Sequence, residues 1–452
     1  MADFARSAHA GVQAQLDRLS KLSPAGDRLG LERVAAVLDR LGRPQDQLPP
    51  VFHVAGTNGK GSTAAFLRAA LEASGLKVHA FTSPHLVRFN ERIRIAGKLV
   101  DDETLYGLLA EVLDAGDAIE PSFFEVATAA AILAFARTPA DACILEVGLG
   151  GRLDATNVIE HPLVTGITNL ALDHQQFLGH GLTDIAGEKA AIAKPGVPLI
   201  TQLYPPEVAG RVAEVAHERG APVIARGGLW DAIVQQGRLH YRDETGELHL
   251  PLPRLPGRHQ GMNAALAVAM LRHQDQLHIP ASALSAAMGW ADWPARLQHL
   301  APGPLVGDRD VWLDGGHNPS AARQIATYAR HHFDDGKPLQ LVFASLATKD
   351  PSGMLEPFKG MVERVLTVPI PDHGCFSPDD LMEIAGSLGF AAEVHENVEQ
   401  ALASASSDER VLILARYTWP ELSSPPMSRC LTSEAARPLS AAHFQRQILL
   451  AA

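Results

Sequence analysis

The residues best suited to chemistry form a glycine-rich stretch that ends in a lysine and a serine. Residues 51–63 read VFHVAGTNGKGST. Gly56, Gly59 and Gly61 let the backbone approach phosphate oxygens closely and turn its N–H groups toward them. Lys60 can neutralise the charge of β- and γ-phosphates, and the Ser62 hydroxyl can bind phosphate or its metal ion. The stretch therefore predicts a site for a nucleoside triphosphate.

The spacing of this stretch departs from the strict GxxxxGK[ST] pattern, because Val54 stands at the position of the first glycine. A glycine-rich turn that arose by chance is the alternative. An apolar strand pattern before the glycines and a helical pattern after them favour the phosphate loop. Such a loop alone leaves a kinase, a GTPase, a motor and a ligase open.

Three further side chains follow or end apolar strand patterns, namely Ser83, Glu146 and His174. The carboxyl ends of parallel strands meet at one edge of a sheet, where ligands bind. Glu146 lies in the apolar run CILEV, where a carboxylate is costly unless it is paired or bound to a metal. Each residue also has a structural alternative. These are a buried ion pair for Glu146, a loop histidine for His174, and a turn or cap for Ser83; taken alone, the last two alternatives are favoured.

The elements that must position these residues alternate between apolar strand patterns and helical patterns. We expect strands at residues 50–55, 77–83, 142–147, 163–168 and 198–201, and helices at 61–73, 123–137 and 183–193. Most of the strands are apolar on both faces, as buried parallel strands are. The first part of the chain is therefore predicted to be an α/β domain, a parallel sheet with helices on both faces.

The second half predicts a hairpin, a helix and a smaller α/β domain. Alternating runs at 238–253 flank a turn at 244–246, and a helical pattern covers 260–272. The proline-rich stretch 293–304 predicts a boundary, so we expect a P-loop ATP-binding domain at 1–297 and a Rossmann-like C-terminal domain at 298–452. Its expected strands are 311–313, 339–344, 365–368 and 411–415, and its expected helices are 320–331 and 378–388.

Composition excludes several classes of protein. The 452 residues include 39 Lys and Arg against 51 Asp and Glu, a net charge of −12, which argues against a general basic surface for nucleic acid. Cys143, Cys375 and Cys430 are far apart, so neither a disulfide framework nor a zinc site is expected. No signal peptide is recognisable, and the longest apolar run, 126–136, is too short to cross a bilayer. We expect a cytoplasmic monomer without nucleic-acid or membrane partners.

Several sequence blocks together resemble the folylpolyglutamate synthase/dihydrofolate synthase family, part of the Mur ligase superfamily. The resemblance runs from about residue 29 to about residue 414. Its blocks, in the family's order, are HVAGTNGKGST (53–63), FTSPHLVRFNERIRIAG (81–97), FFEVATAAA (123–131), ILEVGLGGRLDATN (144–157), LDHQQFLG (172–179), EKAAIAKPG (188–196) and LDGGHNPSAA (313–322).

The resemblance implies ATP and Mg²⁺, with the ion held by Ser83, Glu146, His174 and the ATP phosphates. It also implies that Lys189 is carbamylated, which turns a cation into a carboxylate-like anion near the metal. From its own surroundings in the sequence, Lys189 reads as a surface lysine that pairs with Glu188.

The resemblance assigns further nucleotide contacts to the phosphate loop, including Thr57 and Asn58, and to Asn263, Arg296 and Asp314. Without it, Asn263 is a helix cap and Arg296 a solvated arginine. Asp314 ends the first predicted strand of the second domain. The nucleotide would thus lie between two domains, and their closure would assemble the site.

Organic substrates are assigned by resemblance to two groups of residues. Phe124 could stack on a pterin ring, and Asp154 could bind the pterin's N–H edge; core packing and an Asx turn are the alternatives. Arg92 and His317 are expected to receive the incoming amino acid, with Ser83 nearby. Arginine suits a carboxylate because its fork binds in a bidentate way; the alternative for Arg92 is a solvated charge on a loop.

The implied reaction is ATP-dependent amide formation through an acyl phosphate, with Lys60, Lys189 and His317 as catalytic residues. L-Glutamate is added to 7,8-dihydropteroate, and to tetrahydrofolates as a γ-linked tail. A Mur-type cell-wall ligase and a P-loop protein that binds ATP without ligation are the alternatives. The TSPHL, FFE and DATN blocks favour folate substrates.

The family pattern ends near residue 414. Codons can be chosen for residues 415–427 that, shifted by one base, read Gly-Ser-Leu-Tyr-Leu-Ala-Gly and onward, the segment usual in the family. We therefore hypothesise a frameshift just before Ala415, which would make 415–452 a non-native tail. Ordinary divergence of a tail is the alternative, and the coding DNA across these codons decides between them.

Overall fold

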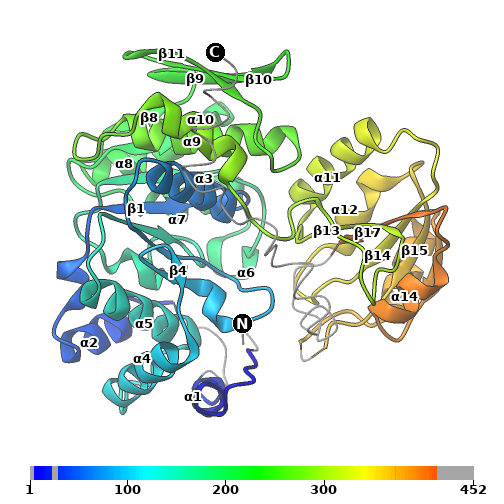
Figure 1. The fold of residues 1–452 in the computed structure, drawn as a ribbon, viewed down its shortest axis with the longest axis horizontal. Coiled ribbons are helices and arrows are strands. Elements are labelled where there is room, and N and C mark those ends of the chain that lie inside the picture. Colours follow the sequence, from blue (N-terminus) through cyan, green and yellow to red (C-terminus); the bar gives the residue numbers. More distant parts are fainter. Residues whose placement is uncertain (1–4, 23–28, 372, 415–452) are drawn as a thin grey trace, which may run out of the picture.

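The structure is a computed structural model that describes residues 5–22, 29–371 and 373–414. Figure 1 shows two lobes, the first running from blue to green and the second from yellow to orange, joined by one crossing segment. The predicted α/β class is confirmed in both lobes. The tail hypothesis for 415–452 and Cys430 lie outside the described residues.

The first lobe is built on a sheet with the strand order β4-β3-β2-β5-β1-β6-β7-β8. From β2 to β8 neighbouring strands are parallel, as predicted, but β3 and β4 form an antiparallel edge. The chain reverses there through Ala96 and Gly97, whose positive φ values of 48° and 87° allow a tight turn. The strands are β1 Val51–Ala55, β2 Val78–Phe81, β3 Ile93–Ile95, β4 Lys98–Leu99, β5 Ala142–Glu146, β6 Val164–Ile167, β7 Leu199–Thr201 and β8 Val223–Ala225.

Helices pack around this sheet, and the three predicted here are confirmed with small shifts at their ends. In α5, Ser122 and Glu125 cap each other's backbone N–H, which fixes the helix start where Phe123 and Phe124 reach the site. The helices are α1 Ala10–Ser20, α2 Glu32–Arg40, α3 Lys60–Ala73, α4 Asp102–Ala115, α5 Phe123–Arg137, α6 Gln175–Leu178, α7 Leu182–Ala190, α8 Pro206–Glu218, α9 Arg258–Arg272 and α10 Ala281–Trp290, with short 3₁₀ turns η1 Pro44–Gln47, η2 Phe89–Arg92 and η3 Ala155–Val158.

A small antiparallel sheet covers helices α9 and α10 at one end of the first lobe (Figure 1). It consists of β9 Trp230–Gln235, β10 Arg238–Asp243 and β11 Gly246–Pro251. The hairpin of β10 and β11 is confirmed, whereas β9 was not predicted. Trp230 and Tyr241 stack with ring centroids 5.8 Å apart and carry this sheet's inner face into the core of the lobe.

The second lobe contains a sheet with the order β12-β13-β17-β14-β15-β16, parallel except for β12. Its predicted strands and helices are confirmed within a few residues, and β12 and β16 are additions. The elements are β12 Gln298–His299, β13 Asp310–Asp314, β14 Leu339–Phe343, β15 Val362–Thr367, β16 Ala391–Val394 and β17 Arg410–Leu414, with α11 Pro319–His332, α12 Pro351–Leu355, η4 Glu356–Phe358, α13 Pro378–Ser387 and α14 Val398–Ser404.

The segment between the lobes is anchored at both ends. Ala291 and Trp293 pack in the core of the first lobe, whereas Ala295 and Leu297 are buried in the core of the second. Ala295 and Leu297 have positive φ values of 54° and 44°, which are unfavourable for residues other than glycine. A domain division between residues 297 and 298 stays a prediction.

Within the described ranges, every helix falls short of the length and apolar character that a bilayer span needs.

Candidate active site

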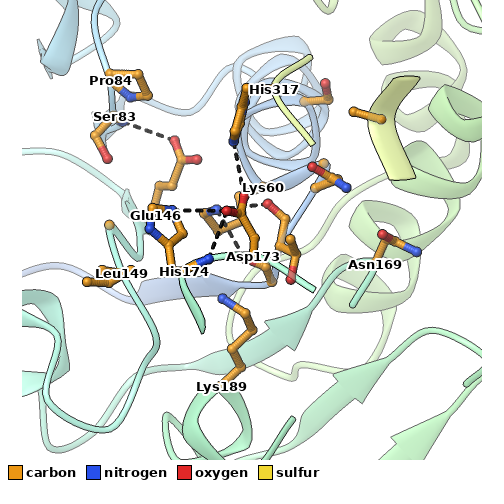
Figure 2. Close-up of a pocket in the computed structure, with 18 of the residues that line it drawn as sticks. Lys60, Ser83, Pro84, Glu146, Leu149, Asn169, Asp173, His174, Lys189 and His317 are labelled. Carbon is orange, nitrogen blue, oxygen red and sulfur yellow. Dashed lines mark hydrogen bonds and ion pairs between the residues drawn. The ribbon is translucent and has the colours of Figure 1, made fainter. Parts of the chain in front are cut away.

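A cavity of about 520 Å³ lies between the lobes, and every site residue predicted from the sequence contributes to its wall. The first lobe supplies the phosphate loop, Ser83, Glu146 and Lys189, and the second lobe supplies the segment from Asp314 onward. Figure 2 shows His317 of the second lobe pointing toward Asp173 of the first, close to Lys60.

The phosphate loop packs too closely against its neighbours for side chains at two glycines. Gly59 has a φ of 96°, and a Cβ there would lie 2.4 Å from Asn263 Oδ1. At Gly56, with φ 142°, a Cβ would overlap the Thr168 hydroxyl. Asn263 Nδ2 donates to Gln260 Oε1 at 3.0 Å, so Asn263 is held by its own helix while it supports the loop. The loop shape predicted from the glycines is therefore enforced by packing.

Two polar side chains of the loop are placed for an anionic ligand. Lys60 Nζ lies over the loop and donates to the carbonyls of Gly56 and Thr57 at 3.0 and 3.3 Å. The Ser62 hydroxyl is buried and has no hydrogen-bond partner among the described residues. A buried hydroxyl of this kind fits a role toward phosphate or a metal ion.

Glu146, Ser83 and His174 meet at the edge of the sheet, on one side of the cavity in Figure 2. Glu146 is 3% exposed at the end of β5 and accepts the Ser83 N–H at 3.1 Å. Burial raises the pKa of Glu146, and the positive charges of Lys60, Arg296 and Arg92 oppose that shift. His174 precedes α6 in the left-handed region, with φ 53°.

This set of donors fits magnesium. Mg²⁺ prefers hard oxygen ligands and keeps several of its waters, so the Glu146 carboxylate and the Ser83 hydroxyl suit it, whereas a nitrogen ligand such as His174 is unusual. Over the described part of the chain, no three His, Cys, Asp or Glu side chains form a metal-holding group by themselves. A divalent ion here would share its coordination with phosphates and water.

Lys189 is buried in the last turn of α7, with 4% exposure, so the alternative of a surface lysine paired with Glu188 is wrong. Glu188 pairs instead with Arg152, at 3.0 Å. Burial, and next the charge of Lys60, lowers the pKa of Lys189 to about 7. A substantial neutral fraction at neutral pH is what reaction of this amine with CO₂ requires.

On the second lobe, Asp314 fixes the segment that carries Arg296. Asp314 is buried at the end of β13, and its carboxylate accepts the N–H groups of Leu297 and Gly316 at 2.8 and 2.7 Å. Burial raises the pKa of Asp314, opposed by Arg296. Arg296 is half-buried, donates to the Ala295 carbonyl at 2.8 Å and lines the cavity.

Asp173 joins the two lobes, a role that the sequence did not reveal. Its carboxylate accepts from Asn318 Nδ2 at 3.1 Å, lies 3.3 Å from His317 Nε2, and forms a buried ion pair with Lys349 (Figure 2 shows its contact with His317). Burial alone would raise the pKa of Asp173, but the hydrogen bond and charge of His317, with His174 and Lys349, lower it well below its ordinary range.

A second contact between the lobes involves the phosphate loop itself. Asn58 Nδ2 donates to Asn318 Oδ1 at 3.1 Å, and Asn318 Nδ2 donates to Asn58 Oδ1 at 2.9 Å. Asp173 could have been noticed as the neighbour of His174 in the same block. Lys349 gave no signal, because only the fold of the second lobe brings it to Asp173.

Phe124, Asp154 and Arg92 also line the cavity wall. The Phe124 ring lies against Gly148, where a Cβ would be 2.4 Å from the ring. Asp154 is buried and accepts the Thr156 N–H at 3.0 Å, so the Asx turn exists alongside its place in the cavity wall.

Arg92 is fully buried in this wall. It donates to His85 Nδ1 at 2.9 Å, and its guanidinium carbon lies 5.5 Å from the ring centroids of both Phe89 and Phe123. The reading of Arg92 as a solvated loop charge is therefore wrong. Its burial beside aromatic rings leaves a cation held in place at the cavity.

Comparisons with known proteins agree on one group. The family model of the Mur ligase middle domain matches residues 54–271. The dihydrofolate synthase/folylpolyglutamate synthase of Bacillus subtilis is 36% identical over 361 residues, which is 76% of this chain and 80% of that protein. The Escherichia coli protein of the same name is 35% identical over 86% of this chain and 89% of its own length.

The solved structures that superpose on this chain belong to the same group of proteins. E. coli FolC in complex with DHPP and ADP superposes with a TM-score of 0.82 and 34% identity, covering 91% of this chain and 96% of that one. A bifunctional folylpolyglutamate synthase/dihydrofolate synthase with Mn, AMPPNP and L-glutamate bound gives a TM-score of 0.79 and 32% identity, over 92% and 97% of the two chains.

Proposed function

Because the chain belongs to the dihydrofolate synthase/folylpolyglutamate synthase family of ATP-dependent ligases, we propose that it joins L-glutamate to 7,8-dihydropteroate and to tetrahydrofolates. The observation that carries the proposal is the shared cavity, where a phosphate loop and a buried carboxylate of one lobe face Asp314 and His317 of the other. The names of the relatives favour this reaction over a Mur-type cell-wall ligase or a P-loop protein without ligation.

For the nucleotide, we propose contacts from Gly56 to Ser62 in the phosphate loop and from Asn263, Arg296 and Asp314. The N-terminus of α3, which begins at Lys60, favours phosphate. Asn263 lies against Gly59 of the loop, and Arg296, in the segment between the lobes, lines the cavity. The charge of the phosphates would thus be met from both lobes.

For magnesium, we propose Ser83, Glu146 and His174 as protein ligands. The ion, when bound, neutralises phosphate charge and polarises the phosphoryl group for transfer. We further propose that Lys189 is carbamylated in the working enzyme, which its burial and its pKa of about 7 support. The carbamate would place a second anionic oxygen group beside Lys60.

The chemistry follows from the poor reactivity of a carboxylate, whose leaving group would be oxide. An oxygen of the acceptor carboxylate attacks the γ-phosphorus of ATP and ADP leaves, which gives an acyl phosphate. The neutral α-amine of glutamate then attacks the carbonyl carbon, phosphate leaves with the C–O bond electrons, and the amine loses one proton. Lys60 and Arg296 stabilise the charge that develops on the phosphoryl oxygens.

The amino acid and the acceptor are proposed to occupy different walls of the cavity. His317 and Arg92 supply positive or hydrogen-bonding groups for the carboxylates of glutamate, with Ser83 near the reacting centre. Phe124 and Asp154 line the end proposed for the pterin ring, where an aromatic face and a carboxylate meet. We propose that the enzyme acts as a cytoplasmic monomer, which sedimentation of the purified protein tests.

The test is ADP release by the purified chain with ATP and Mg²⁺, with and without L-glutamate. Release that needs both glutamate and dihydropteroate, or both glutamate and tetrahydrofolate, is the expected result. UDP-muramyl acceptors serve as the comparison panel. ADP release with those acceptors alone, or independent of glutamate, would contradict the proposal.

A further inference from the structure

A chain of hydrogen bonds runs from the buried strand β1 to the acceptor end of the cavity. His53, in the middle of β1, is fully buried, and its Nε2 lies 2.8 Å from Thr156 Oγ1. Thr156 Oγ1 in turn lies 2.5 Å from Asp154 Oδ1. Asp154 lines the cavity, whereas His53 and Thr156 lie behind it.

The direction of the hydrogen bonds follows from counting donors. Asp154 accepts the N–H of Thr156 and the Thr156 hydroxyl on Oδ1, and the N–H groups of Gly148 and Leu149 on Oδ2. All four contacts are donors to Asp154, so an ionised carboxylate satisfies each of them and needs no proton of its own. Burial raises the pKa of Asp154, and the same donors oppose that shift.

The tautomer of His53 follows from the same count of hydrogen-bond donors. The one hydrogen of the Thr156 hydroxyl points to Asp154, so its oxygen must accept from His53, which therefore carries a hydrogen on Nε2. His53 Nδ1 is buried and has no partner in the part of the chain that the structure describes. Burial, with the charge of Lys194, lowers the pKa of His53 to about 3, so the ring is neutral under working conditions.

We propose that His53 and Thr156 are positioning residues for the pteroate acceptor, which they serve by holding Asp154 ionised and in one orientation. The proposal rests on the proposed function, because it takes the Asp154 end of the cavity as the acceptor's place. Asp154 also holds the N–H groups of Gly148 and Leu149, and Phe124 lies against Gly148. The chain of bonds therefore supports two parts of the same wall.

Loss of this chain of hydrogen bonds should weaken the binding of one substrate only. Removal of the Thr156 hydroxyl takes one donor from Asp154 and the hydrogen-bond partner from His53 Nε2. The phosphate loop keeps its own contacts with Asn263 and Asn169. Hydrogen bonds to charged groups contribute about 1.5–3 kcal/mol, which corresponds to roughly 10- to 100-fold in binding. The acceptor, and not ATP, should bind more weakly.

The experiment compares Thr156→Val, which has the same shape without the hydroxyl, with Thr156→Ser, which keeps it. Thr367→Val is the matched control, because Thr367 is a fully buried threonine of the second lobe whose hydroxyl donates to the Pro378 carbonyl at 2.9 Å. We expect Thr156→Val to raise the KM for dihydropteroate about 10-fold or more, with the KM for ATP unchanged. Thr156→Ser should restore the wild-type KM.

Equal KM values for dihydropteroate in Thr156→Val and Thr367→Val would overturn the proposal, as would a Thr156→Ser variant as impaired as the valine variant. If Thr156→Val does not fold, His53→Gln, whose amide can donate to Thr156, is compared with His53→Leu, and only the leucine variant should lose acceptor affinity.

A wild-type chain that forms no ADP with dihydropteroate would contradict only the dihydropteroate part of the proposed function. Titration calorimetry of dihydropteroate with the same variants then decides the inference: weaker binding by Thr156→Val than by Thr367→Val supports it, and equal binding refutes it.

Discussion

Replacing Lys349 by methionine should loosen the contact between the lobes. Lys349 and Asp173 form an ion pair in which each side chain is only 5% exposed. Removal of one partner of a buried pair costs about 3–5 kcal/mol, because the other charge stays buried without its counterpart. Asp173 keeps its contacts with His317 and Asn318, so we expect a loss of stability near the lower end, about 3 kcal/mol.

The matched control is Lys337→Met. Lys337 pairs with Asp310 at 3.5 Å, with side chains 39% and 16% exposed, and a pair of that kind contributes ~0–1 kcal/mol. Calorimetric unfolding of the wild type, Lys349→Met, Asp173→Asn and the double variant gives the coupling energy between Lys349 and Asp173. A Lys349→Met protein no less stable than Lys337→Met, or a coupling below about 0.5 kcal/mol, would refute the reasoning.

The stability that this contact contributes should be lost at acid pH. The pKa of Asp173 is lowered in the folded protein because the hydrogen bond and charge of His317, with His174 and Lys349, outweigh the effect of burial. A carboxyl group with a lowered folded pKa contributes stability that is fully present above its unfolded pKa of ~4 and is lost as the pH falls toward the folded value. Asp173→Asn should flatten the stability profile in that acid range.

Three further predictions concern the nucleotide end of the cavity. Lys60→Met should lower kcat for dihydropteroate-dependent ADP release by about 10²–10³, since a group that stabilises transition-state charge is lost. Removal of CO₂ should reduce activity, and bicarbonate should restore it better at pH 8 than at pH 6, because the amine of Lys189, with a pKa of about 7, must be neutral to react; Lys189→Ala should show no such response. Gly59→Ala should raise the KM for ATP strongly because its Cβ would meet Asn263, whereas Gly75→Ala, with φ 84° and open space around it, should cost only ~1–2 kcal/mol of stability and leave KM unchanged.

The sequence was sufficient for those parts of the fold that depend on local patterns. Five apolar strand patterns and the glycine-rich turn led to the parallel core of the first sheet, since buried parallel strands are continuously apolar. The strands β3, β4, β8, β9, β12 and β16 were missed. All of them except β9 are short, and β9 pairs on the side of β10 that the hairpin pattern does not use.

The candidate site was predictable only where chemistry and sequence blocks coincide. Glu146 could be found because a carboxylate is rare within an apolar strand. The burial of Lys189 and Arg92 could not be read from the chain, because long cationic side chains are usually exposed and only tertiary packing covers these two. Asp173 and Lys349 are 176 positions apart, so their pairing depends on how the second lobe docks.

The packing of the segment between the lobes determines which residues would move with each lobe. Since Trp293 packs against one core and Ala295 lies in the other, a rotation between the lobes would be absorbed by the few backbone dihedral angles around Pro294, whose own φ is fixed by its ring. Arg296 lies beyond that pivot and is carried with Asp314, whereas Lys60 stays with the first sheet. The two cations proposed for the phosphates thus belong to different lobes, and a small rotation around Pro294 would change the distance between them.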